Sequence, residues 1–246
     1  MFNTNKTGCA YGVGVGPGDP ELITLKAVRI LQEADVIACS GKRPEECAAY
    51  RIAVKTVPEI MKKEMVSISV PMTYDRLVQD KEHTESADRI AAYLEAGKDV
   101  AFLILGDPTI YSSFSYYRRI LDEKGYRTEI ISGVPSFCAA AAKLNISLVE
   151  WQEQMHILPA AHLKDLKKDY SGTTVYMKTG KKLSNLKALI DQSQYEVYAV
   201  QNCGMENEQI FYGEEELPDQ SDYYTTVITK EIRSSADGNP GTISIK

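Results

Sequence analysis

The first half of this chain repeats one pattern: a short apolar run, a glycine-containing turn, and a segment whose apolar residues recur at helical spacing. The pattern opens with CAYGVGV (9–15), the turn GPGDP (16–20) and the helical segment ELITLKAVRILQEA (21–34). It restarts with the short strand DVIA (35–38). Regular alternation of strands and helices predicts a parallel sheet that is covered by helices.

The run VAFLIL (100–105) is the most apolar predicted strand in the chain. A strand that is apolar along its whole length is typical of the centre of a parallel sheet, because helices cover both of its faces. We therefore expect this strand at the centre, ended by the turn GDP (106–108). The pattern also predicts strands at 66–70 and 126–131, and helices at 75–96, 111–124 and 135–143.

The alternation breaks near residues 145–154. Beyond this point the sequence offers strand candidates at 155–158, 173–177, 195–201, 209–212 and 223–229, with few evident helices between them. This half is therefore predicted to be partly antiparallel. We expect two α/β domains, an N-terminal one over residues 1–150 with a mostly parallel sheet and a C-terminal one over 151–246 with a mixed or antiparallel sheet.

Composition and charge narrow the class of protein. Of the 246 residues, 43% are hydrophobic and 25% are charged, which excludes disordered and fibrous chains. The net charge of −6 opposes non-specific binding to nucleic acid. No apolar run approaches the roughly 18–20 residues of a membrane span, and no signal sequence is evident. We expect a cytoplasmic protein with neither a membrane nor a nucleic-acid partner.

Cysteine and histidine usage predicts reduced thiols and no protein-bound metal. The five cysteines are odd in number and have no CxxC spacing, which argues against a disulfide framework. The three histidines belong to neither an HExxH motif nor a Cys/His cluster.

Alternating glycines in GVGVGPGDP (12–20) follow the first predicted strand, where glycine lets a ligand approach the backbone closely. A Rossmann dinucleotide site would need GxGxxG, but Pro17 stands at the third glycine position. Its ribose-binding acid is also missing, since Asp35 lies at the start of the second strand rather than its end. No GxxxxGK[ST] occurs, which excludes an ordinary P-loop. The structural alternative is a tight connection with Asp19 as N-cap of a helix beginning near Glu21.

The loop LGDPTIYSSFSYY (105–117) is the better candidate for a ligand site, because open α/β sheets bind ligands at the carboxyl ends of their strands. Gly106 exposes backbone, and Asp107 could accept hydrogen bonds from hydroxyl or ammonium groups. The structural alternative is a helix N-terminus capped by Asp107, with the tyrosines as packing residues. Both roles can coexist.

Five ordered motifs together resemble one family. GVGPGDPELITLKAVRILQEADV (14–36) matches the family opening GxGPGDPxLxTLKAxxxLxxADV, GDPTIY (106–111) matches its central GDP, and SGVPS (132–136) matches its PGVTS-like turn. MKTG (177–180) and QNCGMENEQIFYG (201–213) complete the set. On these motifs the chain resembles the tetrapyrrole (corrin/porphyrin) methylases, which are S-adenosylmethionine-dependent enzymes.

Within that family the chain is most similar to the C-20 methyltransferases of cobalamin (vitamin B12) biosynthesis, which act on precorrin-2 or on its cobalt complex, cobalt-factor II. The segments that carry this similarity are VPMTYD (70–75), GKDVAFLILGDPTIYSSFSYYRRIL (97–121), SFCAAAAKLNISL (136–148) and HILPA (156–160). The chain departs from the family pattern at Ser132 and Pro135, at Cys39-Ser40, which replace a Tyr-Pro pair, and at Cys203, where glycine is common.

The resemblance implies two α/β domains with both ligands in the cleft between them, usually in a homodimer. It also implies S-adenosylmethionine as methyl donor, S-adenosylhomocysteine as product and an anionic tetrapyrrole as acceptor. Carried over by motif, cofactor contacts, mostly through backbone groups, fall on Pro17, Leu105, Gly106, Asp107, Ile110, Pro135, Ser136, Met177, Cys203 and Thr225.

The chemistry of such a transfer suggests further roles. Alignment of nucleophile, methyl and sulfur supplies about 7–11 kcal/mol in favourable cases, and a base need only remove the proton of the methylated meso carbon. We expect Asp107 to be that base or to orient the substrate, with Tyr111 or Tyr116 as hydrogen-bonding partner. The substrate carboxylates require a basic lining. Substrate contacts are expected at Tyr116, Arg118, Arg119 and Lys178, with Arg51, Lys181 and Lys182 as further candidates.

Three alternatives remain open at this point. A methyltransferase of the same fold could act on another corrin carbon, a protein or an RNA. A non-catalytic tetrapyrrole carrier would bind the macrocycle and transfer nothing, although it has no need of the glycine loops. A nucleotide-binding regulatory module would bind ATP or NAD in preference to S-adenosylhomocysteine.

Overall fold

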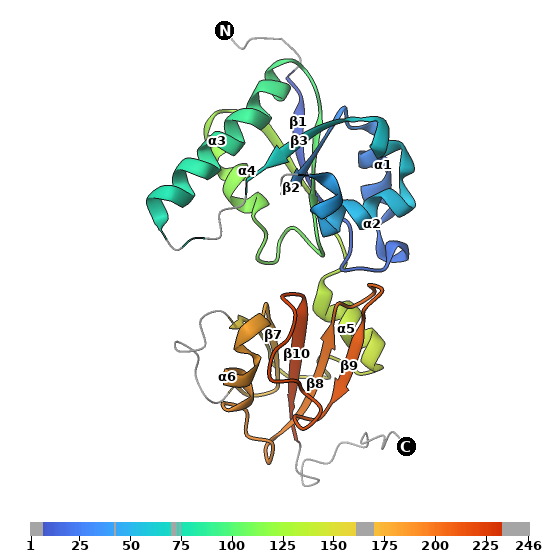
Figure 1. The fold of residues 1–246 in the computed structure, drawn as a ribbon, viewed down its shortest axis with the longest axis vertical. Coiled ribbons are helices and arrows are strands. Elements are labelled where there is room, and N and C mark those ends of the chain that lie inside the picture. Colours follow the sequence, from blue (N-terminus) through green and yellow to red (C-terminus); the bar gives the residue numbers. More distant parts are fainter. Residues whose placement is uncertain (1–6, 42, 70–72, 74, 161–169, 233–246) are drawn as a thin grey trace. The chain divides into compact units, whose positions relative to one another are not determined.

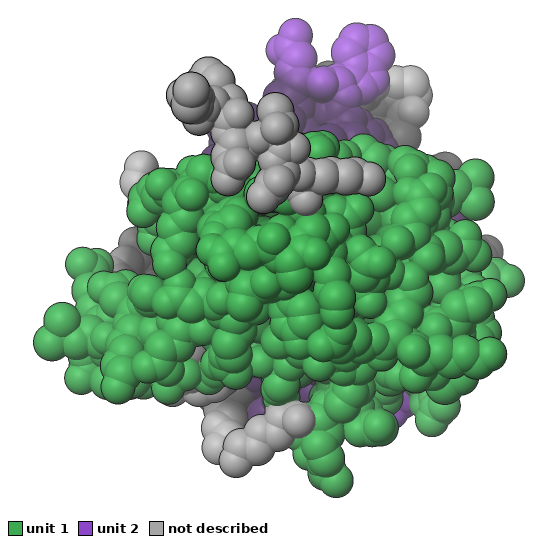
Figure 2. All heavy atoms as spheres, turned by 90° about the horizontal axis from the view of Figure 1, so that it is seen from above, with its two compact units in different colours: residues 1–139, 203–206 green, residues 140–202, 207–246 purple. Residues whose placement is uncertain are grey.

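The computed structural model describes residues 7–41, 43–69, 73, 75–160 and 170–232, so most of the motif VPMTYD (70–75) lies outside the described residues. The chain divides into two compact units, residues 1–139 with 203–206 and residues 140–202 with 207–246 (Figure 2). The division falls at residue 139 rather than near 150, and the segment 203–206 belongs with the first unit.

The first unit holds a five-stranded parallel sheet in the order β3-β2-β4-β1-β5 (Figure 1). Its strands are β1 (Cys9–Gly14), β2 (Val36–Ser40), β3 (Glu64–Ile68), β4 (Val100–Ile104) and β5 (Arg127–Ile131). The prediction that VAFLIL forms the central strand is confirmed, since β4 occupies the middle of the sheet and every one of its residues is buried.

Helices cover both faces of this sheet and create two apolar cores. They are α1 (Leu25–Glu33), α2 (Ala48–Thr56), α3 (Arg76–Glu95) and α4 (Phe114–Glu123), with short 3₁₀ helices η1 (Pro20–Leu22), η2 (Pro44–Glu46) and η3 (Pro58–Lys62). Helix α5 (Ser136–Leu144) begins in the first unit and continues into the second. Side chains of a strand alternate between faces. Leu103 therefore packs in the core formed with α1 and α2, whereas Phe102 packs in the core formed with α3 and α4.

Two helices begin later than their apolar patterns predict. Asp19 is a cap as expected, accepting a hydrogen bond from Glu21 N at 2.9 Å, but it caps only the single turn η1. The long helix α1 begins at Leu25, because Thr24 Oγ1 accepts from Ala27 N at 3.1 Å. Helix α4 begins at Phe114 rather than near residue 111, since Tyr111 has a φ of +46° that a right-handed helix does not contain.

The second unit holds a mixed five-stranded sheet in the order β6-β7-β10-β8-β9. The strands are β6 (Met155–Pro159), β7 (Thr173–Met177), β8 (Tyr195–Gln201), β9 (Gln209–Tyr212) and β10 (Thr225–Glu231), accompanied by η5 (Gly180–Lys182) and α6 (Leu183–Lys187). Strands β6 and β7 are parallel, and the other pairs are antiparallel. The predicted change from a parallel to a partly antiparallel sheet is therefore confirmed.

Across the described ranges, every helix is either too short or too polar to reach from one side of a membrane to the other.

Candidate functional site

The first unit contains a point where the chain leaves two adjacent parallel strands in opposite directions. From β1 it passes through α1 to β2 on one side, and from β4 it passes through α4 to β5 on the other. Open α/β sheets bind their ligands at such a point, outside the carboxyl ends of the strands. The loops that follow β1 and β4 contain GPGDP (16–20) and GDPTIY (106–111), the two segments singled out in the sequence.

The backbones of these two loops are joined directly. Gly106 N donates to Gly16 O at 2.8 Å, and Gly16 N donates to Gly106 O at 3.4 Å. Both glycines have a φ near the left-handed region, +79° at Gly16 and +75° at Gly106, where a side chain would be strained. The glycines thus allow the bridge that fixes one loop against the other.

Asp107 ties a third loop to this bridge. Its Oδ2 accepts from Gly133 N at 2.9 Å, and Gly133 lies in the turn SGVPS (132–136) that follows β5. Its Oδ1 accepts from Thr109 N at 2.7 Å and from the Thr109 hydroxyl. Asp107 is buried, with only 8% of its surface exposed. Asp107 therefore caps its own turn and fastens the loop after β5, and it does not cap α4.

The segment 203–206 completes the same cluster from far along the chain. A Cβ added to Gly18 would come within 2.0 Å of Cys203 O, and one added to Gly204 would come within 2.3 Å of Asp19 N. The backbones of residues 18–19 and 203–204 are therefore in direct contact. The predicted cofactor residues on the first unit, from Pro17 through Ser136 together with Cys203, thus belong to loops in mutual contact.

The second unit brings the other predicted residues together at the end of its sheet. Met177 ends β7 and is paired with Thr226, next to the predicted cofactor residue Thr225 at the start of β10. Lys178 Nζ lies 5.8 Å from the centre of the Tyr223 ring, and the φ of Lys178 is +59°. Strained non-glycine backbone is often retained at functional positions, so this turn fits the predicted role.

The tyrosines and arginines after the GDP turn have distinct environments. Tyr111 is 43% exposed, and partial burial raises the pKa of its hydroxyl. Tyr116 is 45% exposed, whereas Tyr117 is buried and donates its hydroxyl proton to Ser69 O at 2.8 Å. Arg118 is paired with Asp122 at 3.3 Å. Tyr117 therefore has a structural role, while the other side chains remain accessible.

All five cysteines carry free thiols, and two of them interact. Cys47 precedes α2, and hydrogen bonds from the Cys39 thiol and from the backbone N–H groups of Tyr50 and Ala49 hold the pKa of Cys47 below its ordinary value. The hydrogen bond to Cys47, together with burial, raises the pKa of Cys39. Within the described ranges, no three histidine, cysteine or acidic side chains gather where they could hold a metal ion.

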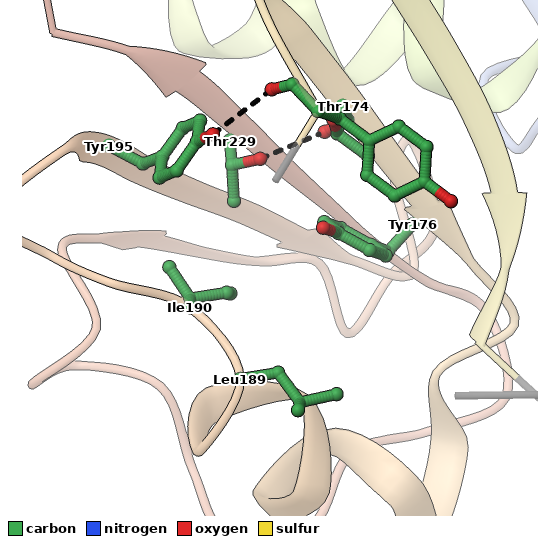
Figure 3. A pocket seen from close by; sticks show the side chains of 7 residues that line it. Thr174, Tyr176, Leu189, Ile190, Tyr195 and Thr229 are labelled. Carbon is green, nitrogen blue, oxygen red and sulfur yellow. Dashed lines mark hydrogen bonds between the residues drawn. The ribbon is translucent and has the colours of Figure 1, made fainter. Parts of the chain in front are cut away.

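A separate small cavity of about 10 Å³, close to the volume that one water molecule needs, lies within the second unit (Figure 3). It is lined by Tyr170, Thr174, Tyr176, Leu189, Ile190, Tyr195 and Thr229. Tyr195 donates its hydroxyl proton to Tyr170 O at 3.1 Å, and burial raises the pKa of Tyr176 to about 12. None of the predicted site residues lines this cavity, so it is distinct from the cluster described above.

Residues 10–218 match the family model of the Tetrapyrrole (Corrin/Porphyrin) Methylases, and the chain belongs to this family. It is 35% identical, over 91% of its own length and 96% of the relative's, to a protein of Methanocaldococcus jannaschii named probable cobalt-precorrin-2 C(20)-methyltransferase. It is 28% identical, over 90% of its own length and 94% of the relative's, to the precorrin-2 C(20)-methyltransferase of a Sinorhizobium species. The resemblance stated from the sequence motifs is confirmed.

Solved structures share the fold. A putative cobalamin synthesis related protein of Corynebacterium diphtheriae superimposes with a TM-score of 0.72 at 18% identity, covering 92% of this chain and all of that one. A cobalt precorrin-4 methyltransferase superimposes with a TM-score of 0.67 at 21% identity, covering 90% of this chain and 94% of that one. These neighbours confirm the prediction of two α/β domains of the tetrapyrrole methylase type.

Proposed function

We propose that this chain transfers a methyl group from S-adenosylmethionine to C-20 of precorrin-2 or of cobalt-factor II in cobalamin biosynthesis. The observation that carries the proposal is the 35% identity to a relative named for this reaction, which extends over 91% of this chain and 96% of the relative. The second relative, named for the metal-free substrate, supports the same carbon of the macrocycle. The two names differ in the metal, so the substrate form is left to experiment.

The loops of the first unit fit the proposed cofactor. A Cβ at Gly106 would be in ordinary van der Waals contact with Ser136 N and Val134 O at 3.8 Å, so this backbone is less tightly covered than that of Gly14 or Gly133, where a Cβ would collide with backbone. The surrounding donors and acceptors are mostly backbone groups, which suit a nucleoside-like ligand whose recognition does not depend on charged side chains. A solved uroporphyrin-III C-methyltransferase from Thermus thermophilus, which shares the fold at a TM-score of 0.66 and 20% identity, contains bound S-adenosylhomocysteine.

When bound, S-adenosylmethionine supplies a methyl group on a sulfonium sulfur, which is a good leaving group. In our proposal the chain contributes positioning, because backbone groups at Leu105, Gly106 and Asp107 would hold the cofactor in a rigid set of loops. The Asp107 carboxylate has about four lone-pair sites, and hydrogen bonds from Thr109 and Gly133 use three of them. One site remains to accept a substrate proton or N–H group.

The proposed acceptor is an anionic tetrapyrrole, and exposed groups of the first unit suit it. Tyr111 and Tyr116 offer hydroxyl groups, and Arg118 and Arg119 offer positive charge for carboxylates. Lys178, on the second unit, is a further proposed substrate contact. A local basic lining is needed because the chain as a whole carries a net charge of −6.

The direct test is mass spectrometry after anaerobic incubation with S-adenosylmethionine and, in parallel, metal-free precorrin-2 and its cobalt complex. A gain of one methyl at C-20, located by isotopic labelling, supports the proposal, and the preferred substrate assigns the metal. Binding of S-adenosylhomocysteine without methyl transfer to either would move the activity to another acceptor. Binding of macrocycle without any binding of S-adenosylhomocysteine would favour a carrier.

We also propose that the active form is a cytoplasmic homodimer, which rests on the family resemblance. Light scattering coupled to size-exclusion chromatography tests the assembly, and a mass equal to one chain would contradict it. Cell fractionation tests the location.

A further inference from the structure

One aromatic pair at the α3–α4 contact includes a residue, His83, that the proposed function does not use. The imidazole of His83 on α3 stacks on the Tyr116 ring of α4, with ring centres 4.7 Å apart and planes 8° from parallel. His83 is only 8% exposed, whereas Tyr116 is 45% exposed. Tyr116 therefore covers the imidazole with one face and keeps a large part of its own surface open to solvent.

The pair is anchored to the sheet by further rings. Tyr117 meets His83 edge-on at 5.5 Å and meets Phe102 of the central strand β4 edge-on at 5.5 Å. The Tyr117 hydroxyl also donates to Ser69 O at 2.8 Å, just beyond β3. Since Tyr117 and Phe102 are fully buried, the chain of contacts runs from the core to an exposed ring. His83 therefore fixes the orientation of Tyr116.

A positive charge lies beside this ring. Arg119 follows Tyr116 by three residues on α4, so both side chains occupy the same side of the helix. Arg119 is close enough to His83 for its charge to help lower the pKa of the imidazole, although burial is the larger cause. The structure gives Arg119 no ion pair with a residue of the described ranges, whereas Arg118 is paired with Asp122. Of the two arginines, Arg119 has the charge that a ligand could use.

The position of the pair suits substrate rather than cofactor. Helix α4 follows the GDP turn, so Tyr116 in its first turn lies near the carboxyl edge of the sheet, where the loop cluster is. A ring and a guanidinium side by side match a pyrrole ring that bears a carboxylate side chain.

We propose that the exposed face of Tyr116 and the guanidinium of Arg119 together bind one carboxylate-bearing pyrrole ring of the macrocycle, and that His83 is the positioning residue that orients Tyr116. This inference rests on the proposed function, whose substrate it places on the α3–α4 face. It also distinguishes the adjacent arginines, giving Arg119 the larger role.

Initial rates under anaerobic conditions test the assignment. His83→Ala should raise the KM for precorrin-2 about three- to tenfold, as expected for a lost aromatic contact, with kcat and the Kd for S-adenosylhomocysteine unchanged. His83→Phe keeps a flat ring under Tyr116 and should restore KM to within about twofold of the wild type. Arg119→Gln should raise KM about tenfold or more, and Arg118→Gln should raise it less than a third as much.

Matched controls keep the test decisive. Arg29→Gln removes an exposed arginine that is paired with Glu33 on α1, a helix on the opposite face of the sheet, and should leave KM unchanged. The assignment is overturned if His83→Phe is as impaired as His83→Ala, or if the Arg118 and Arg119 variants lose equally. Thermal melting identifies any variant that fails to fold. If a variant fails, the KM of the Tyr116→Leu variant is compared with that of the wild type instead.

Failure of the proposed function can be told apart from failure of this inference. If the wild type transfers no methyl to precorrin-2, the proposed function fails, and binding is then measured with uroporphyrin, a stable carboxylated tetrapyrrole, by fluorescence quenching. A weaker affinity in the Arg119→Gln and Tyr116→Leu variants would still support the assignment. Equal affinity in wild type and variants would overturn it.

Discussion

Replacing Asp107 with asparagine separates a loop-fastening role from a chemical one. The carboxylate accepts from Gly133 N through Oδ2 and from the Thr109 backbone and hydroxyl through Oδ1. An asparagine side chain has a single acceptor oxygen, and its NH₂ group can only donate. In the Asp107→Asn variant, either Gly133 or Thr109 must therefore lose its acceptor and face another donor.

The expected cost follows from this geometry. Hydrogen bonds to a charged group contribute about 1.5–3 kcal/mol each, so losing the bond to Gly133 should lower the free energy of unfolding by about that amount. The loop after β5 would also be released from the GDP turn. If half of this energy, about 0.75–1.5 kcal/mol, is felt by the cofactor site, the Kd for S-adenosylhomocysteine should rise about three- to twelvefold, since 1.4 kcal/mol corresponds to a factor of ten.

Urea denaturation, calorimetric titration with S-adenosylhomocysteine and rates at saturating ligands measure the three quantities independently. Thr109→Val is the matched control, because it removes one donor to the same carboxylate but keeps the bond to Gly133; it should cost a similar amount of stability, about 1.5–3 kcal/mol, and leave the Kd for S-adenosylhomocysteine unchanged. Unchanged stability and affinity in Asp107→Asn, together with a loss of a hundredfold or more in kcat, would refute the fastening role and assign Asp107 as the base.

Three further predictions use other parts of the first unit. Gly18→Ala should lower the free energy of unfolding by at least about 1–3 kcal/mol and weaken S-adenosylhomocysteine binding, because its Cβ would lie 2.0 Å from Cys203 O. The control is Gly125→Ala, where φ is +84° and no atom lies within 4 Å of the added Cβ. It should lower the free energy of unfolding, measured by urea denaturation, by only about 1–2 kcal/mol and leave binding intact. In a pH titration followed by the ultraviolet absorbance of thiolate, one thiol should ionise at a lower pH than ordinary cysteine, because the pKa of Cys47 is lowered. Cys47→Ser should remove this first ionisation, and an unchanged titration curve would contradict the assignment. Burial lowers the pKa of His83, so the unfolded chain takes up a proton at higher pH than the folded chain. Urea denaturation should therefore show stability falling as the pH drops below about 6.5, and His83→Phe should flatten this slope.

The unbroken run of apolar residues at 100–105 was enough to predict the central strand. VAFLIL has no polar residue that could face solvent, so only a position covered on both sides accommodates it, and β4 has that position. The GDP turn then had to lie at the carboxyl edge of the sheet, next to the loop after a neighbouring strand. The location of the candidate site thus followed from the sequence pattern and the topology of parallel sheets.

The ends of helices followed less well from the sequence, because single residues decide them. The apolar spacing of 21–34 continues through Ile23 and Thr24, yet the Thr24 hydroxyl offers a better cap and starts α1 afresh. At Tyr111 the left-handed backbone interrupts a segment whose composition suits a helix. The stack of His83 on Tyr116 was also missed, because these residues lie on different helices and no local spacing connects them.

The segment 203–206 shows why a motif can identify a residue that local patterns do not. It lies more than 180 residues after Gly18 in the sequence, yet it packs in the first unit. The family pattern often has glycine where this chain has Cys203. The structure explains why the change is tolerated: Gly18 meets the carbonyl oxygen of Cys203, which any residue has, and the cysteine side chain is buried without displacing that contact. Gly18 and Gly204 have no such freedom, because a Cβ at either position would collide with backbone. The strict requirement at this crossing therefore falls on the two glycines, and position 203 can vary while its backbone remains in place.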